Sequence, residues 1–141
     1  MEELEFREVT FKNCDIDMLY ELLKNRGDHS ISHKKMPSLK DHRDFVKNHP
    51  YRKWYIVLKN GSAYGTFYIL KDNCVGLFLR KWYSSEVKIV LDWIKKNHQP
   101  LSAIPSVRRD TFFINVSPQN SALINILNEL KSNKIQLTFA L

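Results

Sequence analysis

The spacing of apolar residues changes along the chain, and each change marks a new element. Residues 4–11 alternate between apolar and polar side chains, which predicts a strand. Four apolar residues within 16–23 then recur at helical spacing, so we predict a helix there. A short second helix is expected to begin at Ser38, because Ser38 and Asp41 fit the capping-box pattern.

Three strands are predicted in the middle of the chain. Residues 52–59 are rich in aromatic and β-branched side chains and precede Asn60 and Gly61, the pair that most strongly indicates a tight hairpin. Residues 62–70 read as the second strand of that hairpin, and a short turn then leads to a third strand at 74–79. Strands connected this closely are expected to run antiparallel.

Helices and strands alternate in the second half. We predict a helix capped by Ser84 or Ser85, a strand at 111–116, a helix that begins at Ser117 and Pro118, and a last strand at 134–141. The order is therefore β-α-α-β-β-β-α-β-α-β. The helix between the strands at 74–79 and 111–116 makes a crossover, so these two strands should be parallel. The expected fold class is α/β (an α+β mixed sheet), in one domain spanning residues 1–141.

The composition indicates the class of protein and the compartment that we expect for it. Hydrophobic residues make up 43% of the chain, which is typical of a globular domain. The acidic N-terminus has no signal-peptide pattern, and no stretch approaches the length of a membrane span, so no membrane is expected. Cys14 and Cys74 are the only cysteines; we expect free thiols and a cytoplasmic protein.

The net charge of +7 is concentrated in two blocks. Residues 33–59 carry eight basic and two acidic residues, and residues 80–109 carry seven and two. Such blocks indicate an anionic partner or simply a solvated surface. Nucleic acid is not favoured, because no helix-turn-helix, zinc-finger or RNA-recognition pattern occurs. Cysteines and histidines show no metal-ligand spacing, so no metal is expected.

The element order, read with the stretches "NGSAYGTFYILKDNCVGLFL" and "FFINVSPQNSALINILNEL", resembles the GNAT family, the GCN5-related N-acetyltransferases. This resemblance covers nearly the whole chain and implies a GNAT-like acyl-CoA N-acyltransferase fold. It also implies acetyl transfer from acetyl-CoA, as co-substrate, to a primary amine.

The resemblance places the cofactor at the end of the strand at 74–79 and in the turn that follows. The pantetheine arm is expected along the backbone of that strand, and the pyrophosphate on N–H groups at the head of the next helix. Asn120 matches an asparagine that lies near the coenzyme. The residues implied are Leu77, Phe78, Leu79, Arg80, Lys81, Trp82, Tyr83, Ser84, Ser85, Glu86 and Asn120.

The turn departs from the family pattern in having no glycine. Glu86 occupies a position where the family has a small residue, and it places an anion beside the phosphate seat. Arg80, Lys81 and Lys88 offer positive charge in compensation. Two readings stay open: the turn still binds the coenzyme through side-chain charge, or the domain has lost it.

Three side chains are candidates for the acid–base chemistry that amine attack requires. His33 lies in the loop expected to face the acceptor, and it is either a base or an exposed loop residue. Asn115 should point away from its neighbours near a strand end, as a site group or a cap. Tyr83 could donate a proton, whereas His42 fits a packed, satisfied histidine.

The resemblance thus implies an N-acetyltransferase for a primary amine of a small molecule, with a nucleotide-linked amino sugar as one candidate. The basic blocks fit an anionic acceptor, and a homodimer is compatible with the chain. The alternative is a non-catalytic GNAT-like domain that serves as a binding or regulatory module.

Overall fold

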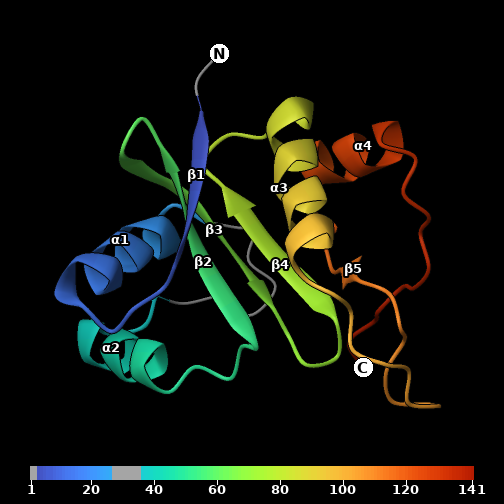
Figure 1. Ribbon diagram of the computed structural model, residues 1–141, viewed down its shortest axis with the longest axis horizontal. Coiled ribbons are helices and arrows are strands. Elements are labelled where there is room, and N and C mark those ends of the chain that lie inside the picture. Colours follow the sequence, from blue (N-terminus) through green and yellow to red (C-terminus); the bar gives the residue numbers. More distant parts are fainter. Residues whose placement is uncertain (1–2, 27–35) are drawn as a thin grey trace.

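The protein is a mixed sheet between two layers of helices (Figure 1), and the computed structural model describes residues 3–26 and 36–141. Within these ranges the sheet has five strands in the order β1-β2-β3-β4-β5. No helix in these ranges is both long and apolar enough to cross a membrane. The strands are β1 (Leu4–Glu8), β2 (Lys53–Lys59), β3 (Ser62–Ile69), β4 (Cys74–Leu79) and β5 (Phe113–Ile114), and the helices are α1 (Asn13–Lys24), α2 (Leu39–Lys47), α3 (Ser84–Asn97) and α4 (Ser121–Glu129).

The predicted hairpin connects β2 and β3. Asn60 and Gly61 both adopt positive φ, at 53° and 78°, the backbone that a type I′ turn requires. Lys59 therefore pairs with Ser62 directly across the turn. The pairs β1–β2, β2–β3 and β3–β4 are antiparallel, whereas β4 and β5 are parallel, which confirms the predicted crossover through α3.

Alternating side chains of the strands build one core on each face of the sheet. α1 and α2 cover one face and pack against Trp54, Ile56 and Phe78. α3 and α4 cover the other face and pack against Phe67 and Leu79. Phe78 and Leu79 are consecutive and point to opposite faces, as the period of a strand requires. β4 therefore contributes to both cores.

The helix starts were predicted less well than the helices themselves. Ser38 caps α2 as expected, with its hydroxyl accepting from the Asp41 N–H at 3.1 Å. The predicted serine cap of α3 is wrong, because α3 begins at Ser84 and its N-cap is Tyr83, whose side chain makes no cap bond. The start of α4 is also wrong: Asn120, and not Ser117, caps that helix by accepting from Leu123 N–H.

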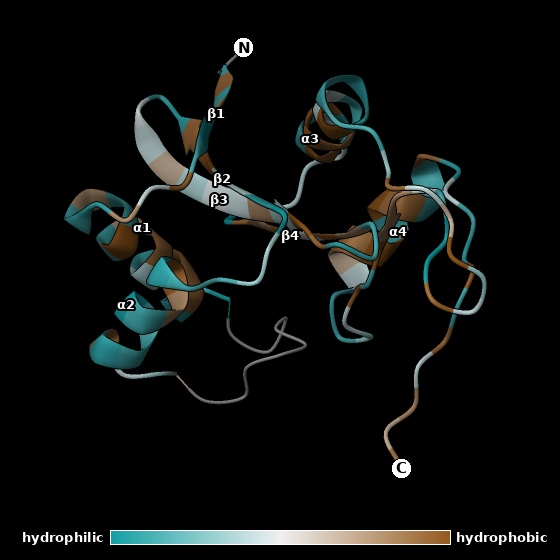
Figure 2. Cartoon of the chain, turned by 60° about the horizontal axis from the view of Figure 1, so that its bottom comes forward, coloured by the Kyte–Doolittle hydropathy of each residue, from teal (hydrophilic) through white to brown (hydrophobic). Residues whose placement is uncertain are grey.

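The last strand, predicted at 134–141, does not form. These residues pair with no strand of the described chain, and Figure 2 shows the C-terminal segment running away from the sheet. Leu137 and Phe139 are 69% and 77% exposed. The alternating pattern gives the segment strand propensity, but β5 pairs with β4 over two residues only and offers no long ladder beside it.

Candidate functional site

β4 and β5 are hydrogen-bonded only along the first part of β4. The parallel ladder joins Cys74 to Phe113 and Val75 to Ile114 and then stops. On the other side, β4 stays paired with β3 as far as Leu79, opposite Gly65. Within the described ranges, no strand therefore covers the β5 side of β4 over residues 76–79.

Alternation along β4 decides which backbone groups face this opening. Leu70 N–H donates to Cys74 C=O at 2.8 Å, and Arg80 N–H donates to Tyr64 C=O at 2.9 Å. The even-numbered residues of β4 thus direct their backbone groups toward β3. Their odd-numbered neighbours point the other way, so the N–H and C=O groups of Leu77 and Leu79 face the opening. These groups could pair with an extended ligand.

The head of α3 lies directly beyond this edge. Tyr83 C=O accepts the first helical bonds, from Glu86 N–H at 3.1 Å and Val87 N–H at 3.0 Å. The N–H groups of Ser84 and Ser85 make no hydrogen bond within the part of the chain that the structure describes. Such N–H groups and the helix dipole favour an anion.

The sequence led us to expect that the charge of Glu86 opposes an anion at the head of α3, but the side chain of Glu86 points into the protein. Its side chain is buried, accepts from the Tyr64 hydroxyl at 2.5 Å, and forms an ion pair with Lys59 at 2.7 Å. Burial and the bond to Glu86 raise the pKa of Tyr64 to about 12, so this hydroxyl stays protonated. The charge of Glu86 is thus neutralised inside the protein, beneath the first turn of α3.

A different carboxylate reaches the head of α3. The Ser84 hydroxyl donates to Glu129 Oε2 at 2.7 Å, which ties the start of α3 to the end of α4. Two of the three cations that were expected to compensate for the missing glycine already have partners within the protein. Arg80 donates to the Ala63 carbonyl at 2.9 Å, and Lys88 forms an ion pair with Asp92 on the surface of α3. Lys81 is exposed in the turn.

Two of the three predicted catalytic residues lie in the part of the chain that the structure describes. His33 lies outside the described residues. Asn115 follows β5 and donates to Cys74 Sγ at 3.5 Å, on the face opposite Ile114, as its position in the strand predicted. Tyr83 is 50% exposed at the head of α3. The catalytic roles of all three remain predictions.

Two buried polar groups, Asn120 and Cys74, have structural explanations. Asn120 is 4% exposed and its side chain is the cap of α4, so its contact with a coenzyme stays a prediction. Burial raises the pKa of the Cys74 thiol to about 11. Because thiolate is the nucleophilic form, Cys74 is a poor nucleophile at neutral pH.

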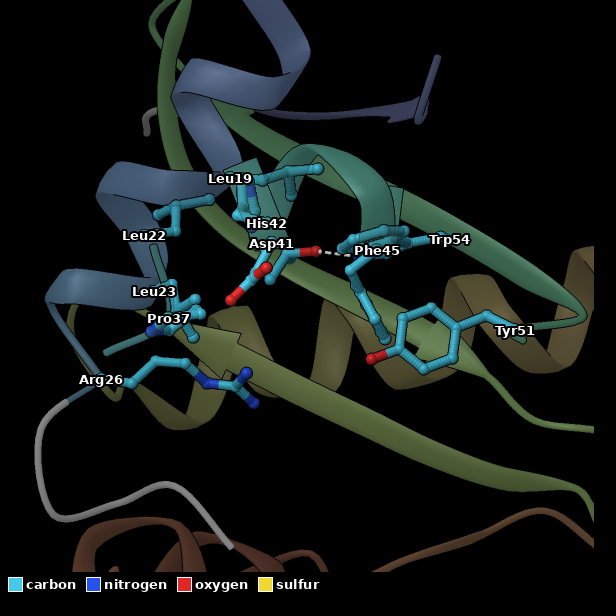
Figure 3. Close-up of a pocket in the computed structure, with 11 residues that line it drawn as sticks. Leu19, Leu22, Leu23, Arg26, Pro37, Asp41, His42, Phe45, Tyr51 and Trp54 are labelled. Carbon is cyan, nitrogen blue, oxygen red and sulfur yellow. Dashed lines mark hydrogen bonds between the residues drawn. The ribbon is translucent and has the colours of Figure 1, made fainter. Parts of the chain in front are cut away.

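A pocket opens on the α1 and α2 face of the sheet (Figure 3). Its volume is about 230 Å³. Leu19, Leu22 and Leu23 of α1 form one wall, and aromatic rings form another. The full lining is Leu19, Leu22, Leu23, Arg26, Pro37, Asp41, His42, Phe45, Tyr51, Trp54 and Thr66.

His42 is the packed histidine that its spacing predicted. It is 5% exposed, and its Nε2 lies 3.0 Å from the Ile16 carbonyl. Because a carbonyl only accepts, Nε2 carries the proton. Burial lowers the pKa of His42, which keeps the ring neutral at pH 7. His42 therefore holds α2 against α1 beside the pocket.

The pocket lies one strand away from the opening at β4. Thr66, on its floor, pairs across the strands with Phe78, and neighbouring strands are about 4.8 Å apart. The Arg26 guanidinium lies over the Phe78 ring, 5.9 Å from its centroid. Arg26 thus connects the pocket to the part of β4 whose backbone faces the opening.

Comparisons with known proteins agree with this geometry. No protein-family model and no curated protein matches the sequence. A domain from Methanocaldococcus jannaschii superposes with a TM-score of 0.69 at 16% identity, covering 96% of this chain and 92% of that one. A GNAT-family acetyltransferase from Streptococcus pneumoniae gives 0.57 at 15% identity, covering 91% and 83%.

The chain has the fold of the GNAT acetyltransferases. RimL, a ribosomal-protein α-N-acetyltransferase solved with coenzyme A, also superposes, with a TM-score of 0.60 at 14% identity, covering 89% of this chain and 77% of its own. The predicted mixed α/β GNAT fold is thereby confirmed, apart from its last strand.

Sequence reasoning missed Glu129, the inward-facing partners of Glu86 and the pocket beside the site. Lys59 and Tyr64 flank the hairpin turn, but nothing in their spacing indicates Glu86 as their partner. Glu129 lies at the end of α4 and meets Ser84 only because the two helices pack side by side. Arg26 follows α1 with no motif around it.

Proposed function

We propose that this protein is an acetyl-CoA-dependent N-acetyltransferase acting on a primary amine. The observation that carries the proposal is the parting of β4 and β5, which leaves backbone groups of Leu77 and Leu79 facing an opening next to the head of α3. The shared fold supports the same reading. The pantetheine arm would pair with that backbone, and the phosphates would lie at the first turn of α3.

The reaction itself asks little of the side chains. The neutral amine nitrogen attacks the thioester carbonyl carbon, a C–N bond forms, and the C–S bond breaks. The amine loses a proton to a base or to water, and the departing thiolate of coenzyme A takes one up. A backbone N–H of β4 would polarise the carbonyl, and proximity would supply much of the rate.

The acceptor is proposed to be a small amine with an anionic group. The nucleotide-linked amino sugar suggested by the sequence is too large for the pocket as a whole, since pockets for ligands of drug size are roughly 300–1,000 Å³. Only one ring of such a molecule would enter it. The reaction proposed here therefore does not depend on a nucleotide.

Calorimetric titration with acetyl-CoA tests the proposal. We expect saturable binding at micromolar concentration, and a ligand at 100 times its Kd adds about 2.7 kcal/mol of stability. Acetyl-pantetheine, which lacks the nucleotide and its phosphates, should bind more weakly. Lys81→Gln should weaken the binding of acetyl-CoA but not that of acetyl-pantetheine. Lys96→Gln removes the same charge at the far end of α3 and serves as the control.

A second function is favoured by the contact between Ser84 and Glu129. That contact brings a carboxylate to the helix head where the phosphates would lie. If acetyl-CoA gives neither heat nor a rise in Tm at 1 mM, the enzyme proposal fails. A non-catalytic binding module is then the better description.

A further inference from the structure

The pocket beneath α2 has the size and lining of a site for one ring. A cavity of about 150 Å³ is enough to hold benzene, and this pocket measures about 230 Å³. Phe45, Tyr51 and Trp54 present their rings to it, and leucines of α1 close the other side (Figure 3). An aromatic ring or a branched aliphatic group with a short chain fits this space.

The polar groups on the pocket floor are already satisfied. Trp54 Nε1–H donates to Thr66 Oγ1 at 2.8 Å, and the Thr66 hydroxyl donates to the Tyr55 carbonyl at 2.8 Å. The His42 Nε2–H is taken by the Ile16 carbonyl. The floor therefore favours an apolar group, because a polar one would find these partners engaged.

Two charges of opposite sign stand at the mouth of the pocket. Arg26 follows the end of α1, and Asp41 lies in the first turn of α2. Figure 3 shows their charged groups on the same side of the pocket. A guanidinium pairs well with a carboxylate, and the Asp41 carboxylate favours an ammonium group. A ligand with only a carboxylate would be repelled by Asp41, and a ligand with only an ammonium group would be repelled by Arg26.

We infer that the pocket binds an α-amino acid with an aromatic or large aliphatic side chain, as the acceptor of the proposed acetyl transfer. The side chain enters the pocket, and the carboxylate pairs with Arg26. This inference rests on the proposed function, because the acceptor role needs acetyl-CoA at β4. The binding of the amino acid itself does not.

This placement brings the amine to the correct strand. Arg26 lies over Phe78, and the α-amine is separated from the carboxylate by one carbon. An amine held next to Arg26 would thus lie close to the Phe78 side chain, on the strand whose backbone faces the opening. It loses a proton through water beside Asp41 and attacks the thioester, which yields the N-acetyl amino acid and free coenzyme A.

NMR of the tryptophan indole N–H groups tests binding without any turnover. Trp54 lines the pocket, whereas Trp93 packs on the α3 face and serves as an internal control. Trp54→Phe assigns the reporter signal. Three probes separate the charges: L-phenylalanine carries both, 3-phenylpropionate lacks the amine, and phenethylamine lacks the carboxylate.

We expect L-phenylalanine to shift the Trp54 signal saturably and to bind at least tenfold more tightly than either single-charge probe. Arg26→Gln should weaken L-phenylalanine about tenfold and should not weaken phenethylamine, which has no carboxylate and is repelled by the guanidinium. Arg43→Gln removes the same charge from α2, where the guanidinium bonds to Asn13 away from the pocket, and should have no effect. Circular dichroism checks that each variant is folded.

The inference is overturned if no probe shifts Trp54 at 10 mM, if Trp93 shifts equally, or if Arg26→Gln and Arg43→Gln behave alike. These results leave the acetyl-CoA titration untouched, so the proposed function can survive them. Conversely, the protein could bind L-phenylalanine but not acetyl-CoA. That result would support the amino acid as the ligand of the pocket and would refute the proposed acetyl transfer.

Discussion

Replacing Glu86 by glutamine should cost stability and leave acetyl-CoA binding almost unchanged. The Glu86 carboxylate is held by Lys59 and Tyr64 inside the protein. Glutamine keeps the shape and one oxygen acceptor but removes the charge. The Lys59 ammonium then loses the Glu86 carboxylate at a position where its side chain is only 18% exposed.

The size of the loss follows from the two contacts. A hydrogen bond to a charged group contributes about 1.5–3 kcal/mol, and breaking a fully buried ion pair costs about 3–5 kcal/mol. Lys59 can still reach water in part, and Tyr64 keeps an acceptor, so the loss should lie near 2–3 kcal/mol. For a chain of this size that corresponds to a fall in Tm of about 8 °C.

Urea unfolding at pH 7, followed by circular dichroism, measures the loss. Asp92→Asn is the matched control, since it also removes a carboxylate of α3 from a lysine pair. Lys88 and Asp92 are 61% and 54% exposed, so this control should cost little stability. Equal losses for the two variants, or a marked gain in acetyl-CoA affinity for Glu86→Gln, would refute the reasoning.

Three further predictions concern other parts of the fold. Burial alone would raise the pKa of Asp15, but hydrogen bonds led by Arg7 lower it to about 2. The stabilisation of the folded state by these hydrogen bonds is fully present above the ordinary Asp pKa near 4 and is lost as the pH falls from about 4 to 2. Asp15→Asn should therefore cost about 2 kcal/mol at pH 7 and much less at pH 2.5, measured by urea unfolding. Gly76→Ala should cost about 2 kcal/mol in the same assay and alter near-UV circular dichroism, because a Cβ would collide with the Tyr68 ring. Leu137→Asp should change stability by less than about 0.5 kcal/mol, since the residue is exposed; a loss above 1 kcal/mol would show that the segment packs as a strand.

The elements that the sequence predicted correctly are those set by local rules. The hairpin at Asn60 and Gly61 follows from positive φ at both residues, and the Ser38 cap follows from a hydroxyl three residues before an N–H. The crossover between β4 and β5 follows from chain connectivity and handedness. The hairpin and the cap depend on neighbours in sequence, and the crossover depends on the order of elements, so the sequence pattern suffices for all three.

The errors arose where a choice among local candidates depended on packing. Ser117 and Pro118 fit a helix start, but the buried Asn120 provides the cap of α4. The Ser84 hydroxyl was expected to cap α3 and instead donates to Glu129 of α4. In both cases several polar residues lie within a few positions, and the position of the helix against the sheet selects one of them.

By itself, the sequence determined the order of elements as far as α4, the antiparallel hairpins and the class of fold, because these depend on periodicity and turn chemistry. The resemblance also implied a coenzyme site at the end of β4 and the head of α3, and this site stays a prediction. Only the tertiary structure decided where the charges point. Glu86 turns inward to Lys59 and Tyr64, Glu129 arrives at the helix head from α4, and Arg26 reaches Phe78. Contacts between residues far apart in sequence depend on the packing of helices on the sheet, which no local pattern records.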